Sequence, residues 1–155
     1  MSLEDIRHER IKKIDILRQN GIDSYPASTR RAYLIGDVLK KFRKIAKSKK
    51  KVGIAGRIFA KREHGGSMFL DLCDATGKVQ VYFKKDVLGE KYDMALETMD
   101  IGDFIETEGK LFKTKRGEET VEISRWAMLA KSLRPLPEKW HGLQDEEERF
   151  RRRYL

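Results

Sequence analysis

The sequence predicts a mainly β domain with flanking helices, built around a five-stranded Greek-key barrel. Apolar and polar residues alternate along residues 52–83 and again along 103–129, as they do in half-buried strands. Corners at His64-Gly65-Gly66 and Asp74–Gly77 interrupt the first region, which is typical of an antiparallel meander. Apolar residues at helical spacing precede the first region and separate it from the second.

Residues 1–51 predict a basic, helical N-terminal extension. Ser2 and Asp5 form a capping box in which aspartate replaces the usual glutamate or glutamine, and Asn20-Gly21 supplies a C-terminal stop. A loop around Pro26 follows. A second helix is predicted from about Tyr33 to Ser48, because apolar residues recur there on one side.

Residues 52–131 predict the barrel itself. Three strands occupy 52–83, a helix is predicted over 86–100, and two further strands run from Asp103 to about Leu129. Three strands, a helix and two strands is the order of the OB-fold, whose second and third strands form the face that binds oligonucleotides. The sequence therefore predicts an OB-fold.

Residues 132–155 differ from the barrel and predict a linker followed by the start of another domain. Pro135 and Pro137 exclude a regular helix or a central strand there. A helix is then predicted from about Leu143, with acidic residues early and arginines late, as the helix dipole favours.

The positive charge of the protein is concentrated in its N-terminal third. The net charge is +9; residues 1–51 carry 15 Lys and Arg against 6 Asp and Glu, whereas residues 52–133 carry 13 against 14. A basic extension on a near-neutral barrel suits a polyanion such as RNA. The alternative is a solvated helix face that only keeps the protein soluble. The predicted phosphate-binding residues lie on the second helix and are Lys40, Lys41, Arg43, Lys44 and Lys47.

The residues argue against catalysis within this chain. Histidines occur in three unrelated contexts, and the single cysteine, Cys73, provides neither a disulfide nor a metal framework. No Walker-type phosphate loop is present. We therefore expect no catalytic residues and no metal site. The sequence contains no apolar run of membrane-spanning length and no secretory signal, which predicts a cytoplasmic protein without a membrane partner.

Four side chains are candidates for reading a nucleotide base: Arg57, Phe69, Gln80 and Glu118. Strand alternation places Phe69 on the face opposite its aliphatic neighbours, where a ring can stack on a base. Glutamine offers a donor and an acceptor, arginine only donors, and ionised glutamate only acceptors. Arg57, Phe69 and Gln80 are expected to converge on one sheet surface. The alternatives are a core phenylalanine, a solvent-facing glutamine and an arginine in a cross-strand ion pair.

Three segments carry a resemblance to a known family: AGRIFAKREHGGSMFLDLCDATGKVQVYF, GDFIETEGKLFKTKRGEETVEI and KSLRPLPEKWHGLQDEEERFRRRYL. They resemble the N-terminal part of class II lysyl-tRNA synthetases. The first segment also fits the aspartyl and asparaginyl relatives, whereas the third is much more specific to the lysyl enzymes. The resemblance covers nearly all 155 residues and is weakest before Lys51.

The resemblance implies an anticodon-binding domain for the lysine tRNA. The stacking phenylalanine of the family, placed under the central uridine, falls on Phe69, its glutamine on Gln80 and its arginine on Arg57. Its glutamate falls on Glu118, with the neighbouring Glu119 and Glu122 as alternatives. The N-terminal helices are expected to lie along the anticodon stem. The family's dimer-forming and ATP-binding motifs do not occur here, so this chain alone is expected to be inactive and to hold no cofactor, while ATP and magnesium serve the parent enzyme.

The resemblance also implies a homodimer for the full-length enzyme and a monomer or weak dimer for this fragment. Two other functions remain open at this point. One is a sequence-tolerant single-strand-binding OB protein, which needs stacking but no base readout. The other is a protein-interaction module, for which Phe69 would make no contribution to RNA binding.

Overall fold

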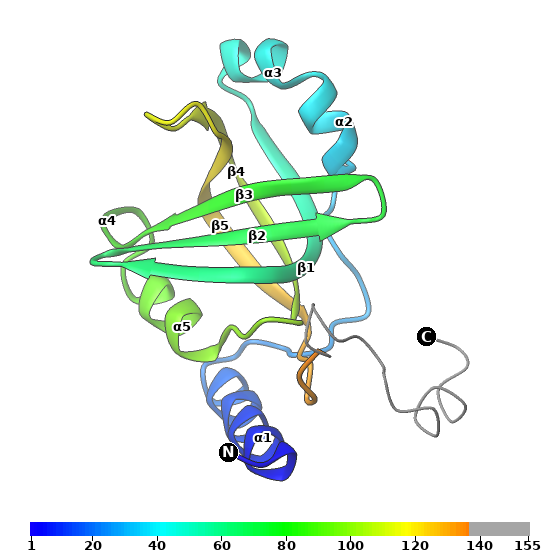
Figure 1. Ribbon diagram of the computed structural model, residues 1–155, viewed down its shortest axis with the longest axis vertical. Helices are drawn as coiled ribbons and strands as arrows, with labels where there is room; N and C mark the ends of the chain where they lie inside the picture. The colour runs from blue at the N-terminus through cyan, green and yellow to red at the C-terminus, as the bar shows by residue number, and fades with distance from the viewer. Residues whose placement is uncertain (137–155) are drawn as a thin grey trace.

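A closed five-stranded barrel forms the body of the computed structural model, which describes residues 1–136 (Figure 1). The strands lie around the barrel in the order β1-β2-β3-β5-β4. All neighbours are antiparallel except β3 and β5, whose parallel pairing closes the barrel. This architecture confirms the predicted OB-fold. The strands are β1 (Lys51–His64), β2 (Ser67–Asp74), β3 (Gly77–Lys84), β4 (Phe104–Lys113) and β5 (Glu119–Ala130).

Strict alternation in β2 and β3 separates the core from the outer surface. Met68, Leu70 and Leu72 are fully buried, whereas Phe69 between them is only partly buried. The outward direction predicted for Phe69 is thus confirmed. In the β2–β3 pairing, Asp71 lies opposite Gln80, so these two polar residues share the outer face with Phe69.

The long strand β1 changes its alternation in the middle. Its register against β2 pairs Ile58 with Leu72 but Ala60 with Asp71, so Phe59 is an extra residue in the ladder. Such a bulge moves every later side chain to the opposite face from the one that simple alternation predicts. Arg57 and Arg62 therefore both lie on the outer face of the barrel, although simple alternation would place residues five apart on opposite faces.

The first helix forms as predicted, but the two later predicted helices are each divided in two. The α1 helix (Leu3–Gln19) begins with the predicted capping box, in which the Ser2 and Asp5 side chains each bond the other's backbone N–H. The predicted single helix over 33–48 is wrong. It is two helices, α2 (Ile35–Lys40) and α3 (Phe42–Ser48), separated at Lys41.

The break at Lys41 has a packing reason. The two short helices bury Val38 and Phe42 against different parts of the barrel, because α2 packs on β3 and α3 packs on β4. One straight helix could not follow this curved surface. The predicted helix over 86–100 is likewise divided, into α4 (Lys85–Leu88) and α5 (Glu90–Thr98), at Gly89 with φ +56°. The helix predicted from Leu143 lies outside the described residues.

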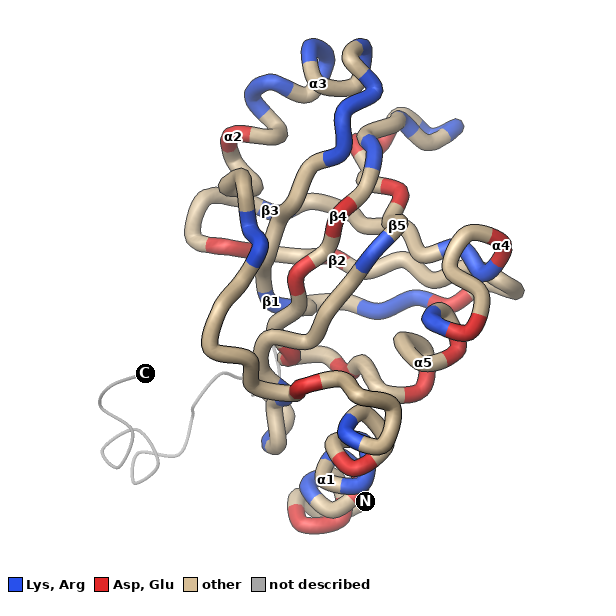
Figure 2. Tube along the Cα trace, turned by 180° about the vertical axis from the view of Figure 1, so that it is seen from behind, with Lys and Arg blue, Asp and Glu red and all other residues tan. Residues whose placement is uncertain are grey.

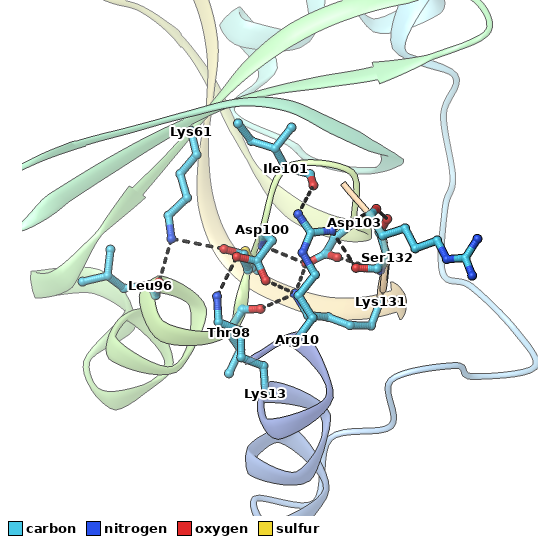
Figure 3. A network of polar contacts seen from close by, with 12 residues as sticks. Arg10, Lys13, Lys61, Leu96, Thr98, Asp100, Ile101, Asp103, Lys131 and Ser132 are labelled. Atoms are coloured by element: carbon cyan, nitrogen blue, oxygen red, sulfur yellow. Dashed lines mark hydrogen bonds and ion pairs between the residues drawn. The ribbon is translucent and has the colours of Figure 1, made fainter. Parts of the chain in front are cut away.

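A buried ion cluster joins α1 to the end of the barrel (Figure 3). It consists of Lys131, Asp100, Asp103 and Lys13, and we call it the Lys131 cluster. The Lys131 and Asp103 side chains are fully buried, with 2.6 Å between Lys131 Nζ and Asp103 Oδ2. Lys131 Nζ also binds Asp100 and donates to the Thr98 carbonyl, and Lys13 Nζ lies 2.6 Å from Asp100 Oδ1. The cluster therefore fastens α1 to the α5–β4 connection.

Arg10 extends this cluster to the chain that leaves β5. Its guanidinium donates to the carbonyls of Ser132 (2.7 Å), Arg134 (3.2 Å) and Ile101 (3.2 Å). Arg10 is only 8% exposed, and these three acceptors satisfy much of its hydrogen-bonding capacity.

The cluster predicts a loss of stability in acid. Burial raises the pKa of Asp100, but the hydrogen bonds and charges of Lys13 and Lys131 outweigh it and hold the pKa below its ordinary value of 3.8. A depressed folded-state pKa contributes stability that is present above the unfolded value and lost as the pH falls through the folded value. We expect the free energy of unfolding to fall below about pH 4, measured by urea titration at several pH values.

The variant Asp100→Asn should be less stable at pH 7 and should show a smaller further loss in acid. Asp86→Asn is the control, because no ion pair or hydrogen bond of the Asp86 side chain occurs among residues 1–136. An unchanged acid slope in Asp100→Asn would contradict the assignment to this carboxylate.

Candidate nucleic-acid interface

An open groove of about 870 Å³ lies on the outer face of the barrel. Its walls come from β1, β2, β3, the β4–β5 hairpin and one residue of α2, Leu39. Phe69, Gln80 and Glu118 all line it. Three of the four predicted base-reading residues, distant in sequence, are therefore brought to one concave surface.

Phe69 is held from one side by a second ring. The ring centroids of Phe69 and Tyr82 lie 4.6 Å apart at an interplanar angle of 21°, and Tyr82 in turn lies 6.0 Å from Phe112. The Tyr82 hydroxyl is 3.0 Å from the Ser67 hydroxyl, which anchors the middle ring. Stacked aromatic pairs are stable arrangements. The part of Phe69 that remains exposed faces the groove, where a planar base can stack on it.

Gln80 lies at the centre of a polar network on the groove floor. Arg62 Nη2 donates to Gln80 Oε1 at 3.0 Å, and Gln80 Nε2 donates to Thr120 Oγ1 at 3.0 Å. Arg62 is positioned by Asp71, with 2.9 Å between Nη2 and Oδ1. The Gln80 carboxamide is thus oriented at both ends, with one lone pair and one N–H left for a ligand.

Glu118 lies at the tip of the β4–β5 hairpin with its side chain exposed to the groove. Its backbone N–H donates to Thr114 Oγ1 and its carbonyl accepts from the Thr114 N–H, which closes the turn. Glu119 also lines the groove, whereas Glu122 does not. The acceptor position can therefore be filled by Glu118 or by its immediate neighbour.

Arg57 does not join the other three residues. It lies opposite Cys73 in the β1–β2 ladder, donates through Nε to the Gly102 carbonyl at 3.2 Å, and its guanidinium lies 5.2 Å from the Phe104 ring centroid. The expectation that it converges with Phe69 and Gln80 is wrong. Arg57 precedes the Phe59 bulge and faces outward, but its neighbour in β2 is Cys73, whereas Phe69 lies opposite Arg62, so Arg57 does not line the groove with Phe69 and Gln80. Arg62, which follows the bulge and lies directly opposite Phe69, places a guanidinium in the groove.

The basic side chains of α2, α3 and the break between them do not line the groove, which these helices reach only through Leu39. Lys40, Lys41, Arg43, Lys44 and Lys47 are all exposed, and no ion pair involving them occurs within residues 1–136. Figure 2 shows the Lys and Arg positions gathered along α3 at one end of the barrel. Their role as phosphate contacts stays a prediction. The hairpin residues Lys115 and Arg116, which the sequence reasoning did not select, line the groove.

Asp74 fixes α2 beside the β2–β3 turn. Its carboxylate accepts from the Ile35 N–H at 2.9 Å and from Thr76 within its own turn. Burial raises the pKa of Asp74, but the hydrogen bonds from Thr76, Ile35 and Gly77 outweigh it and lower the pKa below its ordinary value. The carboxylate therefore stays ionised at neutral pH and holds the basic helix at the groove edge.

The closed barrel defines an OB-fold, and its outer groove presents a partly exposed aromatic ring and an oriented carboxamide. A family model described as an OB-fold nucleic acid binding domain, of the tRNA anticodon type, matches residues 52–136. The chain belongs to this family.

Curated relatives match the chain along almost its whole length. The lysine–tRNA ligase of Carboxydothermus hydrogenoformans is 44% identical over 99% of this chain and 31% of its own length. The lysine–tRNA ligase of Fervidobacterium nodosum is 41% identical over 99% of this chain and 30% of its own length. This chain therefore spans about 30% of the length of these relatives. Within residues 1–136, no helix is long and apolar enough to cross a membrane.

Proposed function

We propose that this domain binds the anticodon loop of the lysine tRNA and reads its central uridine. The observation that carries the proposal is the groove in which Phe69, Gln80 and Glu118 come together. The lysine–tRNA ligase relatives support the choice of tRNA. On this proposal the domain serves a cytoplasmic, dimeric ligase whose ATP- and magnesium-dependent chemistry lies in regions that this chain does not include.

The chemistry of the groove suits a uracil base. Phe69 stacks on the ring, as aromatic side chains do on splayed bases of single-stranded RNA loops. Uracil presents an N3–H between two carbonyl oxygens, so it can donate to Glu118 or to Gln80 Oε1 and accept from Gln80 Nε2 or Arg62. Arg62 takes the part that the resemblance gave to Arg57.

The basic residues of α2 and α3 would bind phosphates of the stem and loop. Such contacts add affinity without base preference and weaken steeply with salt, because binding releases counterions from the RNA. One barrel with a short basic helix pair buries little surface, so we expect the isolated domain to bind weakly.

The test compares a lysine-tRNA anticodon hairpin with the same hairpin carrying cytidine in place of the central uridine. We expect the exchange to reduce binding by about 1–3 kcal/mol, the range of a good base-specific contact. Gln80→Ala should erase most of this difference, because the amide is the group that faces the base edge. Fluorescence anisotropy at two salt concentrations measures both quantities. Gln19→Ala, which removes an exposed amide on α1, is the matched control.

The outcomes separate the alternatives. Equal binding of both hairpins, sensitive only to salt and to Phe69, would indicate a sequence-tolerant single-strand binder and overturn uridine recognition. Binding of neither hairpin would indicate a protein-interaction module.

A further inference from the structure

We propose that Thr120 is a positioning residue that fixes the orientation of the Gln80 carboxamide and thereby decides which pyrimidine the groove accepts. This inference rests on the proposed function and adds to it a residue that does not line the groove itself. Three hydrogen bonds on the groove floor carry it.

The first two hydrogen bonds concern the hydroxyl of Thr120. Thr120 is fully buried in β5 and lies opposite Gln80 in the parallel β3–β5 pair. Its Oγ1 donates to the Glu118 carbonyl at 3.2 Å. A hydroxyl has one hydrogen, so toward Gln80 this oxygen can only accept. The group of Gln80 that faces it at 3.0 Å must therefore be the amide nitrogen, Nε2.

The third hydrogen bond fixes the other end of the same amide. Arg62 has only donors, so the atom that faces its Nη2 at 3.0 Å must be an acceptor, Oε1. Arg62 cannot turn away freely, because Asp71 holds the same nitrogen at 2.9 Å. Rotating the carboxamide by 180° would set N–H against guanidinium, and the Thr120 hydroxyl could donate to the rotated carbonyl only by giving up its hydrogen bond to Glu118. Both neighbours demand one orientation.

A fixed amide distinguishes the two pyrimidines that RNA uses. Uracil presents a donor at N3 beside a carbonyl oxygen at C4, whereas cytosine presents an acceptor at N3 beside an amino group. The two edges are reversed, so an amide held in one orientation matches one of them and opposes the other. An amide that rotates freely would match either. Specificity for uridine over cytidine therefore depends on what holds Gln80.

The test is the isosteric change Thr120→Val, with both hairpins. It removes the hydroxyl acceptor, while the Glu118 carbonyl keeps its hydrogen bond from the Thr114 N–H. We expect the uridine-to-cytidine discrimination to fall by about tenfold, because a single well-placed base contact is worth about that much. The change should include tighter binding of the cytidine hairpin than the wild-type domain shows. Thr120→Ser keeps the hydroxyl and should restore discrimination.

Thr107→Val is the matched control. Thr107 is 1% exposed in the same barrel, and its Oγ1 has no hydrogen-bond partner in the described part of the chain. It should leave discrimination unchanged. Arg62→Met removes the donor at the other end of the amide and should also relax discrimination. Circular-dichroism melting checks each fold.

Unchanged discrimination in a folded Thr120→Val domain would overturn the positioning role of Thr120 while leaving uridine recognition intact. Equal weakening of both hairpins in Thr120→Val would also overturn it, because that is the result of a merely structural role. A wild-type domain without any preference would overturn the proposed function together with this inference. A side-chain amide signal of Gln80 that shifts in Thr120→Val without RNA present would support the inference independently.

Discussion

Replacing Phe69 with alanine is expected to weaken binding of the anticodon hairpin by about 1–3 kcal/mol, the value of one base stacked on an aromatic ring. The loss should be similar for the uridine and cytidine hairpins, since every base has a π face. Phe69→Tyr should retain most of the affinity. Anisotropy titrations at one fixed salt concentration measure the difference, because the phosphate contribution changes with salt.

The control for this prediction is Phe59→Ala. Phe59 is an exposed aromatic residue of the same barrel, at the β1 bulge, and it does not line the groove. It should leave hairpin binding unchanged. If the Phe69→Ala domain binds the hairpin as tightly as the wild type, Phe69 does not stack on a base, regardless of the result for Gln80→Ala.

Replacing Lys131 with methionine is expected to lower the free energy of unfolding by about 3–5 kcal/mol, because it leaves buried carboxylates without a counter-charge. Asp103 is fully buried, and Asp100 also loses the Lys131 ammonium. The double variant Lys131→Met with Asp103→Asn should recover part of the loss, since the most buried negative charge is then removed as well. Urea denaturation at pH 7 measures both effects.

An exposed ion pair gives the contrast for the Lys131 prediction. Lys12 Nζ lies 2.7 Å from Glu9 Oε1, but both side chains are more than half exposed. Lys12→Met should therefore change the free energy of unfolding by no more than about 0.5 kcal/mol. If the losses in Lys131→Met and Lys12→Met were equal, the Lys131 cluster would not be the stabilising feature that its burial indicates.

Local patterns in the sequence predicted the parts of this molecule that depend on regular alternation. Phe69 and Gln80 lie in β2 and β3, where alternation is uninterrupted, and their outward direction followed directly from their neighbours. The capping box at Ser2 is also a local signal, and it formed as expected.

Features that depend on distant contacts were missed. The outward direction of Arg62 results from one extra residue, Phe59, whose bulged conformation depends on its pairing with β2 and leaves no clear mark in the strand's own residues. The break at Lys41 similarly follows from the curvature of the barrel. The sequence gives no local signal for the buried ion pairs of Lys131, because its carboxylate partners lie 28 and 31 residues earlier in the chain.

The Arg10 contacts have a mechanical consequence. A guanidinium is a flat, rigid group with its donors in fixed directions, and this one holds carbonyls from the α5–β4 connection and from two points after β5. Rotation of α1 therefore displaces residues 132–134, and a pull on those residues is transmitted to α1. The direction in which the chain passes Arg134 is set by a helix more than 120 residues earlier in the sequence. We therefore expect α1 and residues 132–134 to move together.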